Sequence, residues 1–372
     1  MKLPCTYYKE PSLHLEKKQH DLRIFSKVLN KGLDSKPWRN AVPLHRFACM
    51  KKSQCEEEMK KESALPWDMV DLSMLFIGLK FASGSHSQLY HGIYKDEPVA
   101  LKMMRMPDEG NYQECNKLVH QYNKEVALLS RLLHPNVIKL VGAIKKPPVY
   151  CIVTEYLSAG SLRAYLHKLD HKSAPMKLWI VMALDIAKGM TYVHSQGIIH
   201  KDLKPENILI NTNFQLKIAD FGIACEEACC DLLCDDPGTY RWMAPEMIKR
   251  KHYDRRVDVY SFGLILWEMM NGSVPYEGMT PMQAAFALVN KNLRPKISED
   301  CPEAMKALIE RCWSVHPKKR PEFWQIVKVL QHFKTSLTNF GTLNKVPHVR
   351  FQDQRKGIFW WIQKLDPKTE FS

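Results

Sequence analysis

Residues 200–222 of this chain read HKDLKPENILINTNFQLKIADFG, and this stretch decides the fold and the chemistry that we expect. It holds a carboxylate at Asp202, a cation at Lys204, an amide at Asn207 and a second carboxylate at Asp220. Phosphoryl transfer from ATP requires a base for the accepting hydroxyl, a cation on the moving phosphate and two oxygen ligands for magnesium. We therefore expect Asp202 to act as the base and Lys204 to steady the phosphate. Asn207 and Asp220 are the expected Mg²⁺ ligands.

Upstream of this stretch, residues 115–133 have the periodicity of a helix with one buried face. That face comprises Leu118, Tyr122, Glu125, Leu129 and Leu132, which recur at alternating spacings of four and three residues. A carboxylate on a buried face is costly unless it is paired. Glu125 therefore either has a cationic partner or reaches water from the edge of the face.

The remaining patterns predict a small β-rich part followed by a larger helical part. Loops rich in Gly, Pro and Asp separate five strand-like runs at 75–84, 87–95, 98–104, 137–144 and 149–157, and residues 107–114 read as a loop. Helical periods follow at 177–197, 257–270, 302–313 and 321–337, and Thr280 with Gln283 predicts a capped helix start. The predicted fold class is α+β.

These ordered motifs resemble the protein kinases. The span from about Trp67 to Phe333 is similar to the plant Raf-like MAP kinase kinase kinases of group C, most closely in KKPPVYCIVTEYL, GTYRWMAPEMI and PMQAAFALV. The resemblance implies a bilobal fold, with a five-stranded β lobe that has one helix and a larger α-helical lobe. It also implies a serine/threonine kinase in a Raf-like intracellular signalling pathway, with ATP and Mg²⁺ as cofactors. Its partners would be protein substrates with Ser or Thr acceptors and upstream or downstream kinases.

The resemblance assigns roles to residues of the first lobe. Lys102 would pair with Glu125 and face the phosphates. The Gly-rich loop departs from the family pattern, because Ala82 and Ser87 replace two glycines, and we expect weakened nucleotide affinity. The implied nucleotide-binding residues of this loop are Phe81, Ala82, Ser83, Gly84, Ser85, His86, Ser87, Gln88 and Leu89. Those around the adenine are Ala100, Thr154, Glu155, Leu157 and Leu209.

Further matches imply supporting contacts in the second lobe. Glu246 would form an ion pair with Arg320, and Asp258 would hold the backbone of the catalytic loop. Thr239 would hydrogen-bond to Asp202 and Lys204. Lys201 stands where the family has arginine.

Residues 223–238 of the predicted activation segment contain no Ser, Thr or Tyr, so phosphorylation cannot order this stretch. A permanent contact between Lys201 and one of five carboxylates is our alternative hypothesis. These carboxylates are Glu226, Glu227, Asp231, Asp235 and Asp236.

Eleven cysteines in a chain of 372 residues are expected to be reduced thiols. Cys225, Cys229, Cys230 and Cys234 crowd the activation segment, where inert thiols, redox-sensitive thiols and a metal site all stay open as interpretations.

The net charge of +14 is concentrated at the two ends, with +6 in residues 1–64 and +4 in residues 333–372. No nucleic-acid-binding motif accompanies it, so no nucleic acid is expected as a partner. We expect residues 1–65 to be a disordered basic extension, 66–334 the kinase domain with lobes at about 66–156 and 157–334, and 335–372 a basic aromatic tail. Without a secretory signal or apolar span, the expected location is the cytoplasm, with the nucleus as an alternative.

Two alternatives remain open at this point. A catalytically weak pseudokinase that serves as a signalling scaffold would explain the altered Gly-rich loop. In the tail, one helical stripe would hold Ile358, Trp361, Ile362 and Leu365. Such a helix can lie on a membrane, bind a partner or fold back on its own domain.

Overall fold

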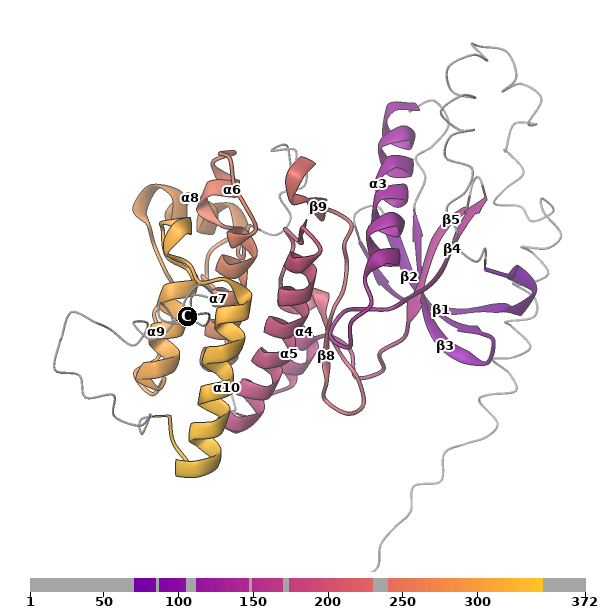
Figure 1. The fold of residues 1–372 in the computed structure, drawn as a ribbon. Helices are drawn as coiled ribbons and strands as arrows, with labels where there is room; N and C mark the ends of the chain where they lie inside the picture. Colours follow the sequence, from indigo (N-terminus) through magenta and orange to yellow (C-terminus); the bar gives the residue numbers. More distant parts are fainter. Residues whose placement is uncertain are drawn as a thin grey trace, which may run out of the picture. The chain divides into compact units, whose positions relative to one another are not determined.

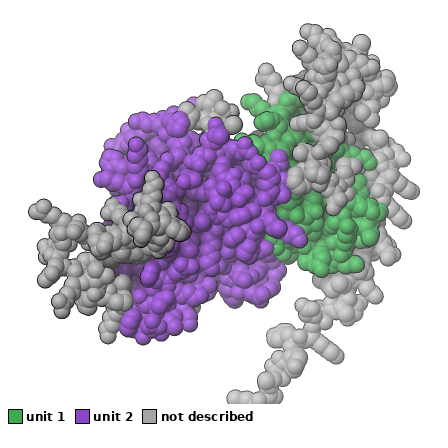
Figure 2. Space-filling view, in the orientation of Figure 1, with its two compact units in different colours: residues 1–126, 140–156 green, residues 127–139, 157–372 purple. Residues whose placement is uncertain are grey.

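The computed structural model describes residues 70–84, 87–104, 112–146, 149–169, 174–229 and 240–343. The chain divides into two compact units (Figure 2). Unit 1 comprises residues 1–126 and 140–156, and unit 2 comprises residues 127–139 and 157–372. Within the described segments, no helix is both long and apolar enough to cross a membrane.

Unit 1 is built on an antiparallel five-stranded sheet (Figure 1), as predicted. Its spatial order is β1-β2-β3-β5-β4, and Lys95 and Asp96 form the β2–β3 turn with positive φ angles of 51° and 65°. Alternate strand residues pack into a core that includes Leu75, Val99 and Leu101. The strands are β1 (Leu75–Ser83), β2 (Ser87–Tyr94), β3 (Glu97–Met104), β4 (Leu140–Lys146) and β5 (Val149–Glu155).

Two boundaries in this region differ from the prediction. β4 begins at Leu140 and not at residue 137, because Val137 forms a parallel bridge with Ile218 and Ile138 donates its N–H to the Ile218 carbonyl, 2.8 Å away. The helix predicted from residue 115 is α3 (Tyr112–Arg131), which begins inside the predicted loop. Residues 112–114 are less than one helical turn, which is too short to show a helical period in the sequence.

The predicted buried face of α3 is confirmed. Its five members are each no more than 3% exposed, and they are Leu118, Tyr122, Glu125, Leu129 and Leu132. The spacing of apolar residues therefore located a buried carboxylate as well as the helix.

Unit 2 is predominantly helical among its described residues. Two short sheets pair β6 (Ile198–Ile199) with β9 (Cys225–Glu226) and β7 (Ile208–Ile210) with β8 (Leu216–Ile218). The helices are α4 (Leu162–Lys168), α5 (Met176–Ser195), α6 (Pro245–Ile248), α7 (Arg256–Asn271), α8 (Pro281–Lys291), α9 (Glu303–Cys312) and α10 (Phe323–Phe340).

Helix α7, predicted over residues 257–270, forms the buried centre of unit 2. Every residue from Val257 to Met269 is buried. At Gly263 a Cβ atom would lie 2.8 Å from Cβ of Cys312, so glycine permits the close approach of α9. The predicted capping box at the start of α8 is also confirmed, with Thr280 and Gln283 exchanging both hydrogen bonds.

Candidate active site

Lys102 and Glu125 form a direct ion pair within unit 1. The ammonium Nζ of Lys102 donates to both carboxylate oxygens of Glu125, at 2.7 and 2.9 Å. The Glu125 side chain is 2% exposed, so of the two predicted possibilities it has a cationic partner and does not reach water. Strand β3 and helix α3 thereby hold one ammonium group in a fixed position, where it can also face a phosphate.

The described residues on either side of the loop between β1 and β2 stay paired despite the altered sequence. Gly84 donates its N–H to the Ser87 carbonyl, 2.8 Å away. Ala82 and Ser87, which replace two family glycines, do not have positive φ angles. The substitutions therefore introduce no left-handed strain. Ser85 and His86 lie outside the described residues.

The residues expected around the adenine are aligned on neighbouring strands of unit 1. Ala100 on β3 faces Thr154 on β5, and Leu89 faces Lys102. Phe81 lies 4.6 Å from His91 between ring centroids, and His91 lies 4.8 Å from Tyr156. In unit 2, Leu209 forms a bridge with Ser161, and Leu157 is buried.

In unit 2, the carboxylate of Asp202 is contacted by the side chains of Lys204 and Asn207. Nζ of Lys204 lies 3.0 and 2.8 Å from the two oxygens of Asp202. Nδ2 of Asn207 donates to Oδ2 of Asp202 at 2.8 Å and to its carbonyl at 2.9 Å. A cation and an amide thus hold the carboxylate in one orientation, and a positioned carboxylate can accept a proton from a hydroxyl group.

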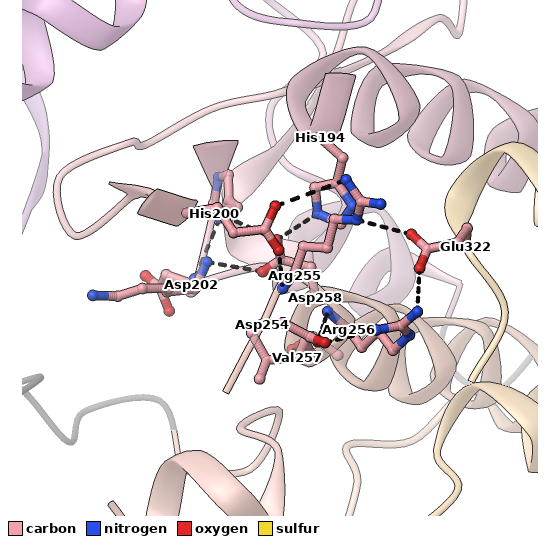
Figure 3. Close-up of polar contacts among 12 residues, drawn as sticks. His194, His200, Asp202, Asp254, Arg255, Arg256, Val257, Asp258 and Glu322 are labelled. Atoms are coloured by element: carbon pink, nitrogen blue, oxygen red, sulfur yellow. Dashed lines mark hydrogen bonds and ion pairs between the residues drawn. The ribbon is translucent and has the colours of Figure 1, made fainter. Parts of the chain in front are cut away.

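A buried network supports the backbone around this carboxylate (Figure 3). Asp258, which is fully buried, accepts hydrogen bonds from the backbone N–H groups of His200 at 2.9 Å and Lys201 at 2.8 Å. Nε2 of His194 lies 2.8 Å from the same carboxylate. Burial by itself would raise the pKa of Asp258, but the contacts with His194 and His200 outweigh it and hold this pKa below its usual range. The predicted role of Asp258 is confirmed.

His200 extends this support to the base itself. Its Nδ1 accepts the backbone N–H of Asp202 at 3.3 Å, and its Nε2 lies 3.1 Å from the Ala219 carbonyl. In these contacts Nδ1 is the acceptor and Nε2 the donor. The ring also packs edge-on against Phe221, with 4.9 Å between centroids. His200 therefore joins the backbone of Asp202 to the segment that contains Asp220.

The two expected magnesium ligands provide suitable donors. The side-chain nitrogen Nδ2 of Asn207 donates to Asp202. The other polar atom of this side chain, the amide oxygen Oδ1, can therefore serve as the metal ligand. Asp220 adopts a left-handed φ of 62° and is exposed. An amide oxygen and a carboxylate fit Mg²⁺, which binds few protein oxygens and completes its shell with water and substrate phosphates.

The predicted ion pair between Glu246 and Arg320 is present. Arg320 donates to the two carboxylate oxygens at 2.5 and 2.9 Å, and its side chain is buried. The contact predicted for Thr239 lies outside the described residues.

Two activation-segment carboxylates bind arginines and not Lys201. Glu226 on β9 lies 2.7 Å from Nη2 of Arg131, and Glu227 accepts the backbone N–H of Arg255 at 3.2 Å. Arg255 also contacts Glu322 at 2.9 Å (Figure 3). Asp231, Asp235 and Asp236 lie outside the described residues, so for them the Lys201 hypothesis stays a prediction.

The expectation of reduced thiols is wrong for Cys225, which is disulfide-bonded. The expectation came from cysteine count and compartment, which do not report how close two thiols lie. Burial raises the pKa of Cys151 to about 12, so that this thiol is unreactive near neutral pH. The described free cysteines are Cys115, Cys151, Cys301 and Cys312.

The sequence interpretation placed a helix over residues 177–197 but gave His194 no role. His194 follows the buried Met190 by four residues, so it lies on the same buried face of α5. A polar residue such as His194 on an otherwise apolar helix face was the signal that could have indicated a buried polar contact.

Comparisons with known proteins agree with this geometry. Residues 75–330 match the family model described as protein tyrosine and serine/threonine kinase. The chain is 54% identical over 263 residues to the serine/threonine/tyrosine-protein kinase HT1 of Arabidopsis thaliana, covering 71% of this chain and 67% of that relative. It is 40% identical over 279 residues to the Arabidopsis thaliana serine/threonine-protein kinase STY46, covering 75% of this chain and 47% of that relative.

A more distant relative is the probable serine/threonine-protein kinase drkD of Dictyostelium discoideum, 37% identical over 275 residues. That match covers 73% of this chain and 20% of the relative, so the chain spans half or less of the length of STY46 and drkD. The predicted resemblance to plant Raf-like kinases and the predicted kinase fold are confirmed. The chain belongs to the family of protein tyrosine and serine/threonine kinases.

Proposed function

We propose that this chain transfers the γ-phosphate of Mg-ATP to serine and threonine hydroxyls of protein substrates. The observation that carries the proposal is the cluster in which Lys204 and Asn207 both contact the carboxylate of Asp202. A chain that serves only as a scaffold has no need to keep a base, a cation and an amide in contact. The kinases HT1 and STY46, which this chain resembles, support the same reaction class.

The proposed roles follow from the chemistry of each side chain. Asp202 accepts the proton of the attacking hydroxyl, and Lys204 neutralises charge on the transferred group. Lys102, held by Glu125, positions the phosphates. Asn207 and Asp220 would hold Mg²⁺, which when bound neutralises charge on the phosphate oxygens. The nucleotide would contact the loop at 81–89, together with Ala100, Thr154, Glu155, Leu157 and Leu209.

The wider organisation is part of the same proposal. Residues 66–334 would form the kinase domain, and the basic flanks at 1–65 and 335–372 would serve regulation or partner binding. Substrates would be proteins of an intracellular signalling pathway in the cytoplasm, with other kinases upstream or downstream.

The test is a comparison of wild type with Asp202→Asn, which replaces the base by an amide of the same shape. Loss of the base should lower turnover of a generic protein acceptor by about 10²-fold or more, while ATP binding changes little because Asp202 is not a nucleotide ligand. Asp300→Asn, an exposed substitution, serves as the control. A scaffold without activity would instead show equal background turnover in all three proteins, and that result would refute the proposal.

A further inference from the structure

Arg163, near the start of α4, binds two carboxylates that come from separate elements of unit 2. Its Nε donates to Glu206 at 2.8 Å, and its Nη1 and Nη2 both donate to Glu268, the latter at 3.3 Å. Its guanidinium also lies over the ring of Trp242, 5.1 Å from the ring atoms' centre. One arginine therefore joins α4, the 3₁₀ turn η4 (Pro205–Asn207), the segment before α6 and helix α7.

This cluster lies beside the proposed reaction centre in the chain. Glu206 directly precedes Asn207 and follows the base Asp202 by four residues. Its side chain is 41% exposed, and that of Arg163 is 22% exposed, so water reaches one edge of the cluster. Because Glu206 and Asp202 belong to one short segment, an acceptor peptide bound at Asp202 would pass close to this edge.

Without Arg163, the same place would be an anionic subsite. Two carboxylates would remain, one of them on Glu268 with a side chain that is 1% exposed. Such a pair attracts an arginine or lysine side chain strongly, because charge-assisted hydrogen bonds gain strength away from water. The buried Glu268 also makes Arg163 hard to displace, since an uncompensated buried charge is costly.

We propose that Arg163 determines acceptor specificity by occupying this subsite, so that the kinase does not select a basic residue beside the phosphorylated hydroxyl. The internal guanidinium makes the contacts that a basic substrate side chain would otherwise make, and it fills the place between the two carboxylates. The inference rests on the proposed kinase function, and it adds the class of substrate to it.

The experiment compares acceptor peptides that are identical except for Arg or Ala at one position, moved stepwise along both sides of the hydroxyl. The ratio of kcat/KM for the Arg and Ala peptides should stay near one in wild type. In Arg163→Met it should rise at one position by about tenfold or more, as expected for one new charge-assisted hydrogen bond. In Arg163→Met/Glu268→Gln the ratio should fall back, because one carboxylate is gone while the volume is kept.

A second variant and a binding measurement distinguish a misfolded or inactive protein from a wrong subsite assignment. Arg163→Gln retains a donor for the buried Glu268 and replaces Arg163→Met if that variant does not fold. Binding of a fluorescent Arg peptide measures the subsite without turnover, so a loss of kinase activity is distinguished from a wrong subsite. A strong Arg preference in wild type, or an Arg-to-Ala ratio and peptide affinity unchanged by Arg163→Met, would overturn the inference.

Discussion

At the scale of single residues, the ion pair of Lys102 with Glu125 links stability to activity. In Lys102→Met the carboxylate of Glu125, 2% exposed, would lose its cation and remain buried. Breaking one side of a buried pair costs about 3–5 kcal/mol, whereas removing both charges costs much less. We expect Lys102→Met to lower the free energy of unfolding and abolish turnover.

The double variant Lys102→Met/Glu125→Gln separates these two effects. It should regain most of the lost stability in urea titrations, because no unpaired charge is left buried. It should stay inactive, because the ammonium that positions the phosphates is absent. Equal destabilisation in the single and double variants would contradict the assigned role of the pair.

Asp258 gives the catalytic loop a dependence on pH. Its pKa in the folded protein lies below the unfolded value of about 3.9, so its ionised form stabilises the fold above that pH. This contribution is lost as the pH falls through the folded pKa. The difference in unfolding free energy between wild type and Asp258→Asn should therefore be large at pH 6 and shrink below pH 4. Urea titrations across this range measure it, and a constant difference would contradict the assignment.

At the scale of elements, β9 and the residue that follows it, Glu227, are held by ion pairs with arginines and not by a phosphate. Glu226 binds Arg131 at the end of α3, the helix that also contains Glu125, and Glu227 binds Arg255 at the start of α7. Because residues 223–238 also lack an acceptor, we expect the enzyme to be active without phosphorylation of this segment. Phosphatase-treated protein, shown by mass spectrometry to carry no phosphate on Thr239 or Tyr240, should keep full initial velocity.

A loss of most activity after phosphatase treatment, restored by preincubation with ATP, would argue against this expectation. The ion pair can be tested separately by reversing its charges. Arg131→Glu and Glu226→Arg should each lower kcat, and the double reversal should restore part of it. Lys296 and Glu299, an ion pair with both side chains more than 80% exposed, provide the matched control in which reversal has no effect.

The elements that sequence predicted well are those with long periodic patterns. Helix α7 and the buried face of α3 followed from apolar spacing alone. The helices α4 and α6 were missed because seven and four residues are too few to establish a period. The cluster around Arg163 was equally invisible, since Glu268 is 105 residues away and only the folded chain brings them together.

At the scale of the whole molecule, part of the positive charge lies in the C-terminal tail, whose contribution to stability and activity can be tested by deletion. The chain has a net charge of +14, and the final 40 residues contribute +4 of it. The first residues of the predicted tail belong to the folded part, because α10 extends to Phe340, Gly341 caps it with a φ of 67° and Leu343 is buried. Deleting residues 345–372 therefore leaves this terminus of α10 intact, and any effect reports the tail itself.

We expect the deletion to lower the melting temperature or to change kcat, because the aromatic residues of the tail are better buried on the protein than exposed to water. Trp361→Asp in the full-length chain should reproduce the effect, since it places a charge on the predicted apolar stripe. Thr369→Ala, outside that stripe, should not. If melting and kinetics stay unchanged while the isolated tail peptide binds anionic vesicles, the tail contacts membranes instead, because its basic residues flank an apolar stripe of the kind that inserts at a lipid surface.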